Sequence, residues 1–245
     1  KKVLDKRTIT INRKLQRDAY VGTRLANIVW EHRKAAQSKD SSARVDQLLM
    51  RYEDALKKCL QLDSGNLFAA NGLARALVEK DELDAAQELL RRVRDASEKT
   101  DQTPCPSAFI NMAHIHMLKR EFNAARIEYE HVLERFAPGG TDPRLGVKDH
   151  AELLVYTASA CNELTQFSDG VEYLNKASAV TPDDLRLTFM LALTHQRWAR
   201  HVLQSAQSDA IITTKQLENS LTSLITAKKK FLWLDEHDGA ADVLP

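Results

Sequence analysis

The side chains best suited to metal binding are spread along the chain without the spacing that a metal site needs. The eight histidines lie at positions 32, 114, 116, 131, 150, 195, 201 and 237. None of them forms the H-E-x-x-H pattern that converges ligands on zinc, and no C-x-x-C pair is present. His114 and His116 are two residues apart on a predicted helix, so they point in different directions. We therefore expect no metal.

Nucleophilic and phosphate-binding motifs are also missing from the sequence. No serine lies in a G-x-S-x-G elbow, and neither G-x-G-x-x-G nor G-x-x-x-x-G-K occurs. The three cysteines are odd in number and far apart, which argues against a disulfide framework, and small buried thiols explain them. The sequence predicts no catalytic residue and no cofactor, and hence a protein that is not an enzyme.

The charge balance offers no general attraction for polyanions. Lys and Arg total 35 and Asp and Glu total 34, a net charge of +1, so we expect no direct nucleic-acid binding and no membrane association. The one run of three basic residues, Lys228 to Lys230, is typical of a solvated helix face. A contact with phosphate or with an acidic partner is the alternative.

Composition and repeats define the elements that carry these residues. With 43% hydrophobic residues but only 8 Gly and 6 Pro, the chain is expected to be helical. A helix, a polar turn and a second helix are predicted at Gly72–Ala86, and the pattern returns 39 residues later at Asn111–Ala125 and 45 residues beyond that at Tyr156–Gly170. Repeats of this kind are typical of helical hairpins of the tetratricopeptide (TPR) class.

Each copy has small residues at the same positions of its two helices. A small residue in the first helix (Ala74, Ala113, Ala158) lets the second helix approach, and another small residue (Ala86, Ala125, Gly170) opens the second helix. Weaker copies flank these three. The predicted fold is all-α, an α-solenoid of about five TPR-type hairpins in a right-handed superhelix. We expect one array over residues 1–245, with units at 18–64, 65–100, 106–137, 150–182 and 184–238 and inserts near 36–46, 100–106 and 138–149.

In a TPR stack the first helices line a concave groove. Counting from the small packing residues predicts a groove richer in apolar side chains than a solvent face should be, which is typical of a protein contact. Some of these side chains could instead pack between repeats. The predicted groove residues are Phe68, Asn71, Arg75, Val78, Ile110, His114, Met117, Val155, Ser159, Asn162, Phe189, Leu193, Gln196 and Arg197.

Several segments are more specific than a general TPR pattern. Gly65–Ala74 resembles the N-L-[YF]-A-A-N-G motif of the large TPR subunit of the PAF complex, and Ser107–Ile115 resembles that family's W-x-N-L-A-H-I segment with Phe109 in place of Trp. Asp18–Trp30 and Leu191–Arg197 resemble two further stretches of that family. The resemblance covers residues 18 to 238 in the same order.

The resemblance implies a nuclear scaffold, a divergent eukaryotic version present here as a fragment. It would hold other PAF subunits on RNA polymerase II and support transcription elongation and histone modification in chromatin. Two other functional hypotheses remain open. One is a chaperone-binding TPR co-chaperone, although Arg75 with Asn71 and Ile110 with His114 make a poor carboxylate clamp. The other is a TPR targeting domain of a larger enzyme.

Overall fold

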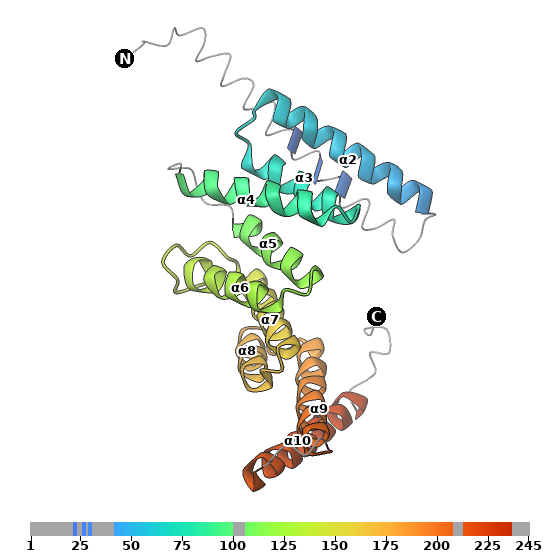
Figure 1. Ribbon diagram of the computed structural model, residues 1–245, viewed down its shortest axis with the longest axis vertical. Helices are drawn as coiled ribbons and strands as arrows, with labels where there is room; N and C mark the ends of the chain where they lie inside the picture. Colours follow the sequence, from blue (N-terminus) through green and yellow to red (C-terminus); the bar gives the residue numbers. More distant parts are fainter. Residues whose placement is uncertain are drawn as a thin grey trace. The chain divides into compact units, whose positions relative to one another are not determined.

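The computed structural model describes residues 22–23, 26–27, 29–30, 42–99, 106–207 and 213–236 of the chain. Within these ranges every regular element is a helix (Figure 1). The described residues between 22 and 30 are helical too. The elements that follow are α2 (Ser42–Leu62), α3 (Leu67–Glu79), α4 (Leu83–Lys99), α5 (Pro106–Leu118), α6 (Phe122–Phe136), α7 (Val147–Glu163), α8 (Phe167–Val180), α9 (Leu185–Gln207) and α10 (Thr214–Glu236).

Three helical hairpins share one turn geometry, which is direct structural evidence of a repeat. Asp81, Arg120 and Thr165 have φ values of 63°, 60° and 60° in the left-handed region, and they are 39 and 45 residues apart. The residue after each of them donates its backbone N–H back to the preceding helix, at 2.9, 2.8 and 2.9 Å. This is the bonding pattern that closes a helix with a left-handed residue. The repeat spacing read from the sequence is thus confirmed at these turns.

The small residues predicted to open each hairpin are buried. Ala74, Ala113 and Ala158 are fully buried in the first helices, and Ala86 and Ala125 are fully buried in the second helices. A side-chain Cβ at Gly170 would overlap Oδ1 of the buried Asn162, which would then have to move. Small side chains at the α3–α4 and α7–α8 crossings allow the two helices of each hairpin to approach closely.

Two compact units make up the chain, and the division between them falls after Ile115, within α5. In the first unit α2 packs on α3 and α3 packs on α4. Its core contains Trp30 and Tyr52, whose ring centroids are 5.0 Å apart. A Cβ added at Gly72 would lie 2.8 Å from the Tyr52 hydroxyl, so a larger residue there would have to displace the buried Tyr52 side chain.

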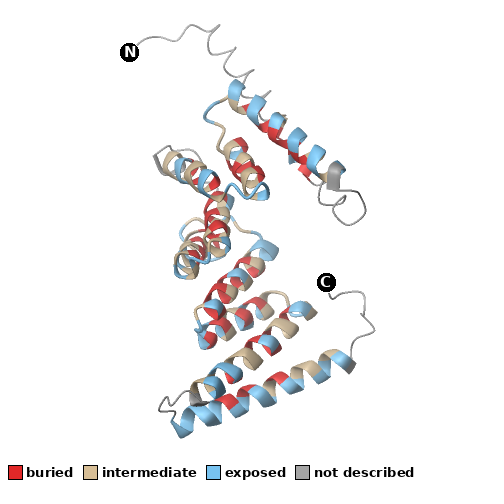
Figure 2. Ribbon diagram, turned by 45° about the vertical axis from the view of Figure 1, so that its right-hand side comes forward, coloured by how far each residue is buried: buried red, intermediate tan, exposed pale blue. Residues whose placement is uncertain are grey.

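In the second unit, consecutive helices pack in pairs from α6 to α10. The core under α7, α8 and α9 is built from leucines and alanines, each leucine contributing about 1.5 to 3 kcal/mol by burial. Its buried members are Leu154, Ala158, Leu174, Ala177, Leu187 and Leu191. Figure 2 shows the buried residues of these helices gathered along the sides that face one another.

The last described helix, α10, buries small residues on one side and exposes large apolar side chains elsewhere. Small residues Ser220, Ser223 and Ala227 are buried on the side that packs against α9. Large side chains, among them Leu221 and Leu232, are exposed elsewhere on the helix. No helix among the described residues is long and apolar enough to cross a membrane.

Candidate protein-binding surface

The predicted groove residues lie on the first helices of the hairpins, and their surroundings differ. Phe68 on α3 is 60% exposed, and Leu193 on α9 is also exposed. The others with partial exposure are Arg75, Val78, Ile110, His114, Met117, Val155, Ser159, Phe189, Gln196 and Arg197. Asn71 and Asn162 are buried.

Asn71 joins α3 to α5 within the first unit. Its Nδ2 donates to Oγ of Ser107 at 3.0 Å, and its Oδ1 accepts from Nδ2 of Asn111 at 2.9 Å. Buried amides need such partners, because an unpaired polar group away from water is costly. Asn71 is therefore engaged in holding two first helices in register.

Similar cross-links join α7 to α9 in the second unit. The buried Asn162 donates to the Thr194 hydroxyl at 2.9 Å, and Arg197 donates to the Glu163 carboxylate at 2.9 Å. Ser159 donates within its own helix, to the Val155 carbonyl at 2.9 Å. Polar side chains on these first helices thus fix the spacing of neighbouring hairpins.

A cavity of about 270 Å³ opens on the first helices of the first unit. Three predicted groove residues line it, Arg75 and Val78 on α3 and His114 on α5, together with Trp30, Ala74, Glu79, Leu90, Asn111 and Ile115. The guanidinium carbon of Arg75 lies 4.2 Å from the Trp30 ring centroid. This is a cation–π contact that holds the charge beside the cavity.

His114 is uncharged in this cavity at neutral pH. Burial, with the positive charge of Arg75 as the smaller cause, lowers the pKa of His114 to about 4. Both effects disfavour the imidazolium form. The cavity therefore presents one permanent cation, Arg75, beside a neutral imidazole, an amide and the Glu79 carboxylate.

A larger pocket of about 740 Å³ lies on α7 and α9 in the second unit. Its lining is mainly apolar, with Val147, Ala151, Val155, Tyr156, Leu187 and Met190, and its charged residues are Lys148, Glu152, Asp183, Asp184 and Arg186. Val147 at its rim is 63% exposed. An open apolar pocket between two first helices is the geometry expected for docking a partner side chain or helix.

The arginine of this second pocket is already paired. Nε and Nη2 of Arg186 lie 3.0 and 2.7 Å from the two carboxylate oxygens of Asp184. Hydrogen bonding to Arg186 is the main reason that the pKa of Asp184 is lowered. The pair neutralises Arg186, and the other charged lining residues are Lys148, Glu152 and Asp183.

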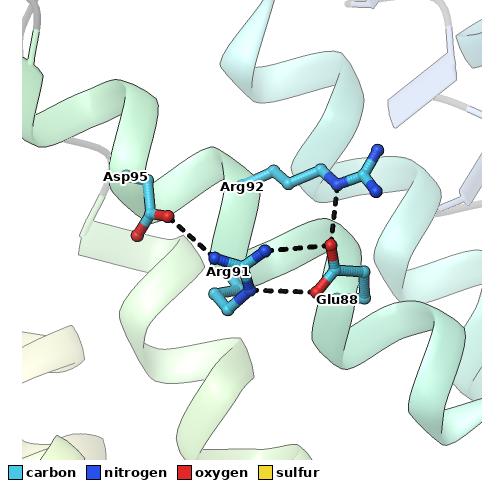
Figure 3. Close-up of polar contacts among 4 residues, drawn as sticks. All are labelled: Glu88, Arg91, Arg92 and Asp95. Atoms are coloured by element: carbon cyan, nitrogen blue, oxygen red, sulfur yellow. Dashed lines mark hydrogen bonds and ion pairs between the residues drawn. The ribbon is translucent and has the colours of Figure 1, made fainter.

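Arginines on α4 are neutralised within their own helix. Figure 3 shows Arg91 between Glu88 and Asp95, with Arg92 also bonded to Glu88. Hydrogen bonds from the two arginines lower the pKa of Glu88 to about 2. This exposed face is a ladder of ion pairs along one helix, which is the usual role of charges at this spacing.

Several lining residues were not among the predicted groove residues. Trp30 precedes the insert predicted near 36–46, which hid its position relative to the later repeats. Val147 and Lys148 lie in the insert predicted near 138–149, but α7 begins there. The signal for an earlier start was available in Asp149, a carboxylate in the first turn of the helix. Met190 adjoins the predicted Phe189 and faces the pocket in its place.

Metal-binding clusters and reactive thiols were sought among the described residues. They contain no cluster of three or more His, Cys, Asp or Glu side chains able to hold a metal ion. Cys59 and Cys161 are buried free thiols, and burial raises the pKa of Cys161 to about 11. Cys105 lies outside the described residues. A thiol so far from ionisation is a poor nucleophile.

Comparison with curated proteins gives consistent relatives at low identity. The chain is 24% identical over 195 residues to "Protein CTR9 homolog" of Arabidopsis thaliana, covering 79% of this chain and 17% of that protein. It is 33% identical over 132 residues to "RNA polymerase-associated protein CTR9" of Saccharomyces cerevisiae, covering 52% and 12%. The Caenorhabditis elegans protein of the same name is 23% identical over 223 residues, covering 90% and 18%. The chain spans less than a fifth of the length of these relatives.

Solved structures share the fold. YrrB, described as a TPR protein with an unusual peptide-binding site, matches with a TM-score of 0.53 at 15% identity, covering 92% of each chain. PilF of Pseudomonas aeruginosa matches with a TM-score of 0.54 at 11% identity, covering 92% of this chain and 95% of its own. MamA of Desulfovibrio magneticus matches with a TM-score of 0.53 at 13% identity, covering 87% and 97%. At such identities these likenesses show the fold alone.

No protein-family description matches this chain. The all-α TPR fold is nevertheless confirmed by the solved structures and by the repeated hairpin turns. The handedness of a superhelix and the five unit boundaries stay predictions. The curated relatives are CTR9 proteins of plant, yeast and worm, so the predicted resemblance to the large TPR subunit of the PAF complex is confirmed.

Proposed function

We propose that this chain is a non-enzymatic scaffold segment that binds protein subunits of the PAF complex and, through them, RNA polymerase II in the nucleus. In that role it supports transcription elongation and co-transcriptional histone modification. The names of the yeast and worm relatives, RNA polymerase-associated proteins, support the choice of complex. The TPR fold supports the choice of protein binding over catalysis.

One structural observation carries the binding role. The first helices α7 and α9 present an apolar pocket of about 740 Å³, and its residue Val147 is exposed to solvent. Exposed apolar surface of this kind is unfavourable unless a partner covers it. The predicted groove residue Val155 lines this pocket, so we place the partner contact here and along the predicted groove.

Affinity purification from nuclear extract with mass spectrometry tests the proposal. The full chain is compared with a Val147→Asp, Val155→Asp variant, in which two carboxylates enter the apolar pocket. The control is Ile127→Asp on α6, a second helix, where the native side chain is 53% exposed. All three proteins must show the same helical circular dichroism.

We expect the wild-type chain and the Ile127→Asp control to recover RNA polymerase-associated subunits, and the pocket variant to lose most of them. Equal recovery by the pocket variant would place the contact elsewhere and overturn the proposed surface. Recovery of heat-shock chaperones in place of polymerase-associated proteins would overturn the proposed complex and favour a co-chaperone.

A further inference from the structure

Arg75 is held in one place by an aromatic ring. Its guanidinium carbon lies 4.2 Å from the ring centroid of Trp30, which is only 5% exposed. Trp30 in turn packs against Tyr52 in the core of the first unit. The contact restricts where the guanidinium can lie, so less rotamer freedom is lost when that group binds a ligand.

This arginine has no anionic partner in the part of the chain that the structure describes. It forms no ion pair and donates no hydrogen bond there, in contrast to Arg91, Arg144, Arg186 and Arg197, which each bind a carboxylate. Glu79 lines the same cavity one helical turn further along α3 and does not pair with it. A half-buried cation without a counter-charge is unfavourable, and stacking on Trp30 offsets only part of that cost.

The remaining walls are apolar or neutral. Val78, Leu90 and Ile115 supply apolar surface, while His114 and Asn111 are uncharged and polar. A cavity of about 270 Å³ is large enough for one amino-acid side chain and too small for a folded element. One cation at the wall of a small apolar cavity complements a short carboxylate-bearing side chain, since a guanidinium binds a carboxylate through two parallel hydrogen bonds.

We propose that this cavity takes an aspartate or glutamate side chain from an extended segment of a partner protein, with the carboxylate bound by Arg75 and the methylene groups against Val78 and Leu90. The inference rests on the proposed function, because it names the chemistry of one contact in the groove. It adds a charge requirement that the apolar pocket of the second unit does not have.

A nucleic-acid phosphate is the competing anion. Phosphate binding along a backbone needs several cations in a row, and this cavity offers one beside the Glu79 carboxylate. The net charge of +1 adds no long-range attraction for a polyanion. A protein carboxylate is therefore the better match.

Selection from a random peptide library tests the charge requirement without knowledge of the partner. Twelve-residue peptides displayed on phage are selected on the full chain and, in parallel, on Arg75→Gln. We expect peptides from the wild-type selection to share an Asp or Glu next to apolar residues, and peptides from the Arg75→Gln selection to lack that preference. Absence of acidic enrichment on the wild-type chain would overturn the inference.

Synthetic peptides with amidated C-termini then give the size of the effect. Replacing the shared Glu by Gln should weaken binding to the wild-type chain about tenfold, the usual effect of losing one hydrogen-bonded ion pair. The same replacement should change binding to Arg75→Gln less than twofold. Arg92→Gln, which removes an exposed and already paired arginine of α4, should retain the tenfold difference.

The remaining outcomes separate the possible failures. A Glu peptide and a Gln peptide that bind the wild-type chain equally would overturn the acidic contact while leaving the proposed scaffold function in place. Tighter binding of a twelve-residue oligouridylate than of the acidic peptide, lost in Arg75→Gln, would show that the cavity serves RNA. Loss of polymerase-associated proteins from the purification would overturn the proposed complex but not the peptide chemistry.

Discussion

Two arginines on first helices, Arg75 in the first unit and Arg186 in the second, lie beside cavities and differ in one respect. Arg186 is bonded through two nitrogens to Asp184 two residues earlier. Arg75 has a tryptophan ring as its neighbour and forms no ion pair within the described residues. The charge of Arg186 is thus neutralised by a neighbour in the chain. The charge of Arg75 is not paired among the described residues and can be used to bind a partner.

The difference explains how one repeat fold can offer chemically distinct contacts. Both cavities rely on the same hairpin packing, and the local neighbours of each arginine decide what the cavity selects. The second pocket can select by apolar shape, because its arginine is neutralised. The first cavity can select by charge, because its cation lies against the Trp30 ring and has no ion pair among the described residues.

The largest effect is expected when a buried leucine that lines each cavity is replaced. Leu90→Ala in the first unit and Leu187→Ala in the second should each lower the free energy of unfolding by about 2 to 5 kcal/mol, because both side chains are almost fully buried. Urea unfolding measures the change. Leu193→Ala, at an exposed position of α9, should change stability by less than about 0.5 kcal/mol. A small loss at Leu90 would mean that the first cavity lies on a loosely packed scaffold.

A second test uses the pH dependence of folding stability that His114 gives to the first cavity. His114 has a folded-state pKa of about 4 against 6.5 for the unperturbed imidazole. The unfolded chain therefore binds more protons between these values, and stability falls as pH drops from 6.5 towards 4. The shift corresponds to about 3 kcal/mol at its limit. Chemical denaturation of wild type and His114→Gln across this range measures the difference.

His150 and His195, whose pKa values burial also lowers, should make the His114→Gln variant lose some stability over the same range. The comparison is therefore between the two slopes. Parallel curves for the variant and the wild type would show that His114 is already protonated or well solvated in the folded protein.

The third test converts the second pocket towards the first. Asp184→Asn should free Arg186 and give the pocket of the second unit a preference for acidic peptides. The expected loss of stability is about 0.5 kcal/mol or less, because the Arg186 side chain of this pair is 64% exposed to solvent. In the wild type, the lowered pKa of Asp184 gives a stabilisation that is present above its usual value of 3.8 and is lost as pH falls through the folded pKa.

Peptide binding by anisotropy, with a Glu and a Gln version of the same sequence, measures the acquired preference. An unchanged ratio in Asp184→Asn would show that an unpaired arginine is not sufficient, and that the stacked tryptophan of the first unit is also required.

The smallest effect is expected at the ion-pair ladder of α4. Arg92→Gln should leave the melting temperature unchanged within error, because the pair with Glu88 is solvent exposed and Glu88 keeps its bonds to Arg91. Thermal melting by circular dichroism is the measurement. A clear fall in the melting temperature would mean that this face is covered in the folded protein.

The sequence predicted the hairpins well because their requirements are local. Ala74, Ala86 and the turn between them fall within fifteen residues, so spacing alone reveals them. The first cavity depends on Trp30 and Arg75, which are 45 residues apart with the whole of α2 between them. No rule of spacing predicts that pair. Asn71 shows the same limit, since its burial depends on Ser107 and Asn111 of another helix.

The three left-handed turn residues suggest how this chain could change over evolution or by engineering. Asp81, Arg120 and Thr165 hold a backbone conformation that costs a residue with a side chain about 1 kcal/mol relative to glycine. Each turn therefore tolerates a strain that a single substitution to glycine could relieve, far enough from the others for the gains to add. A scaffold with this additional folding stability could accept destabilising changes in its cavities and acquire new partners while its hairpins stay folded.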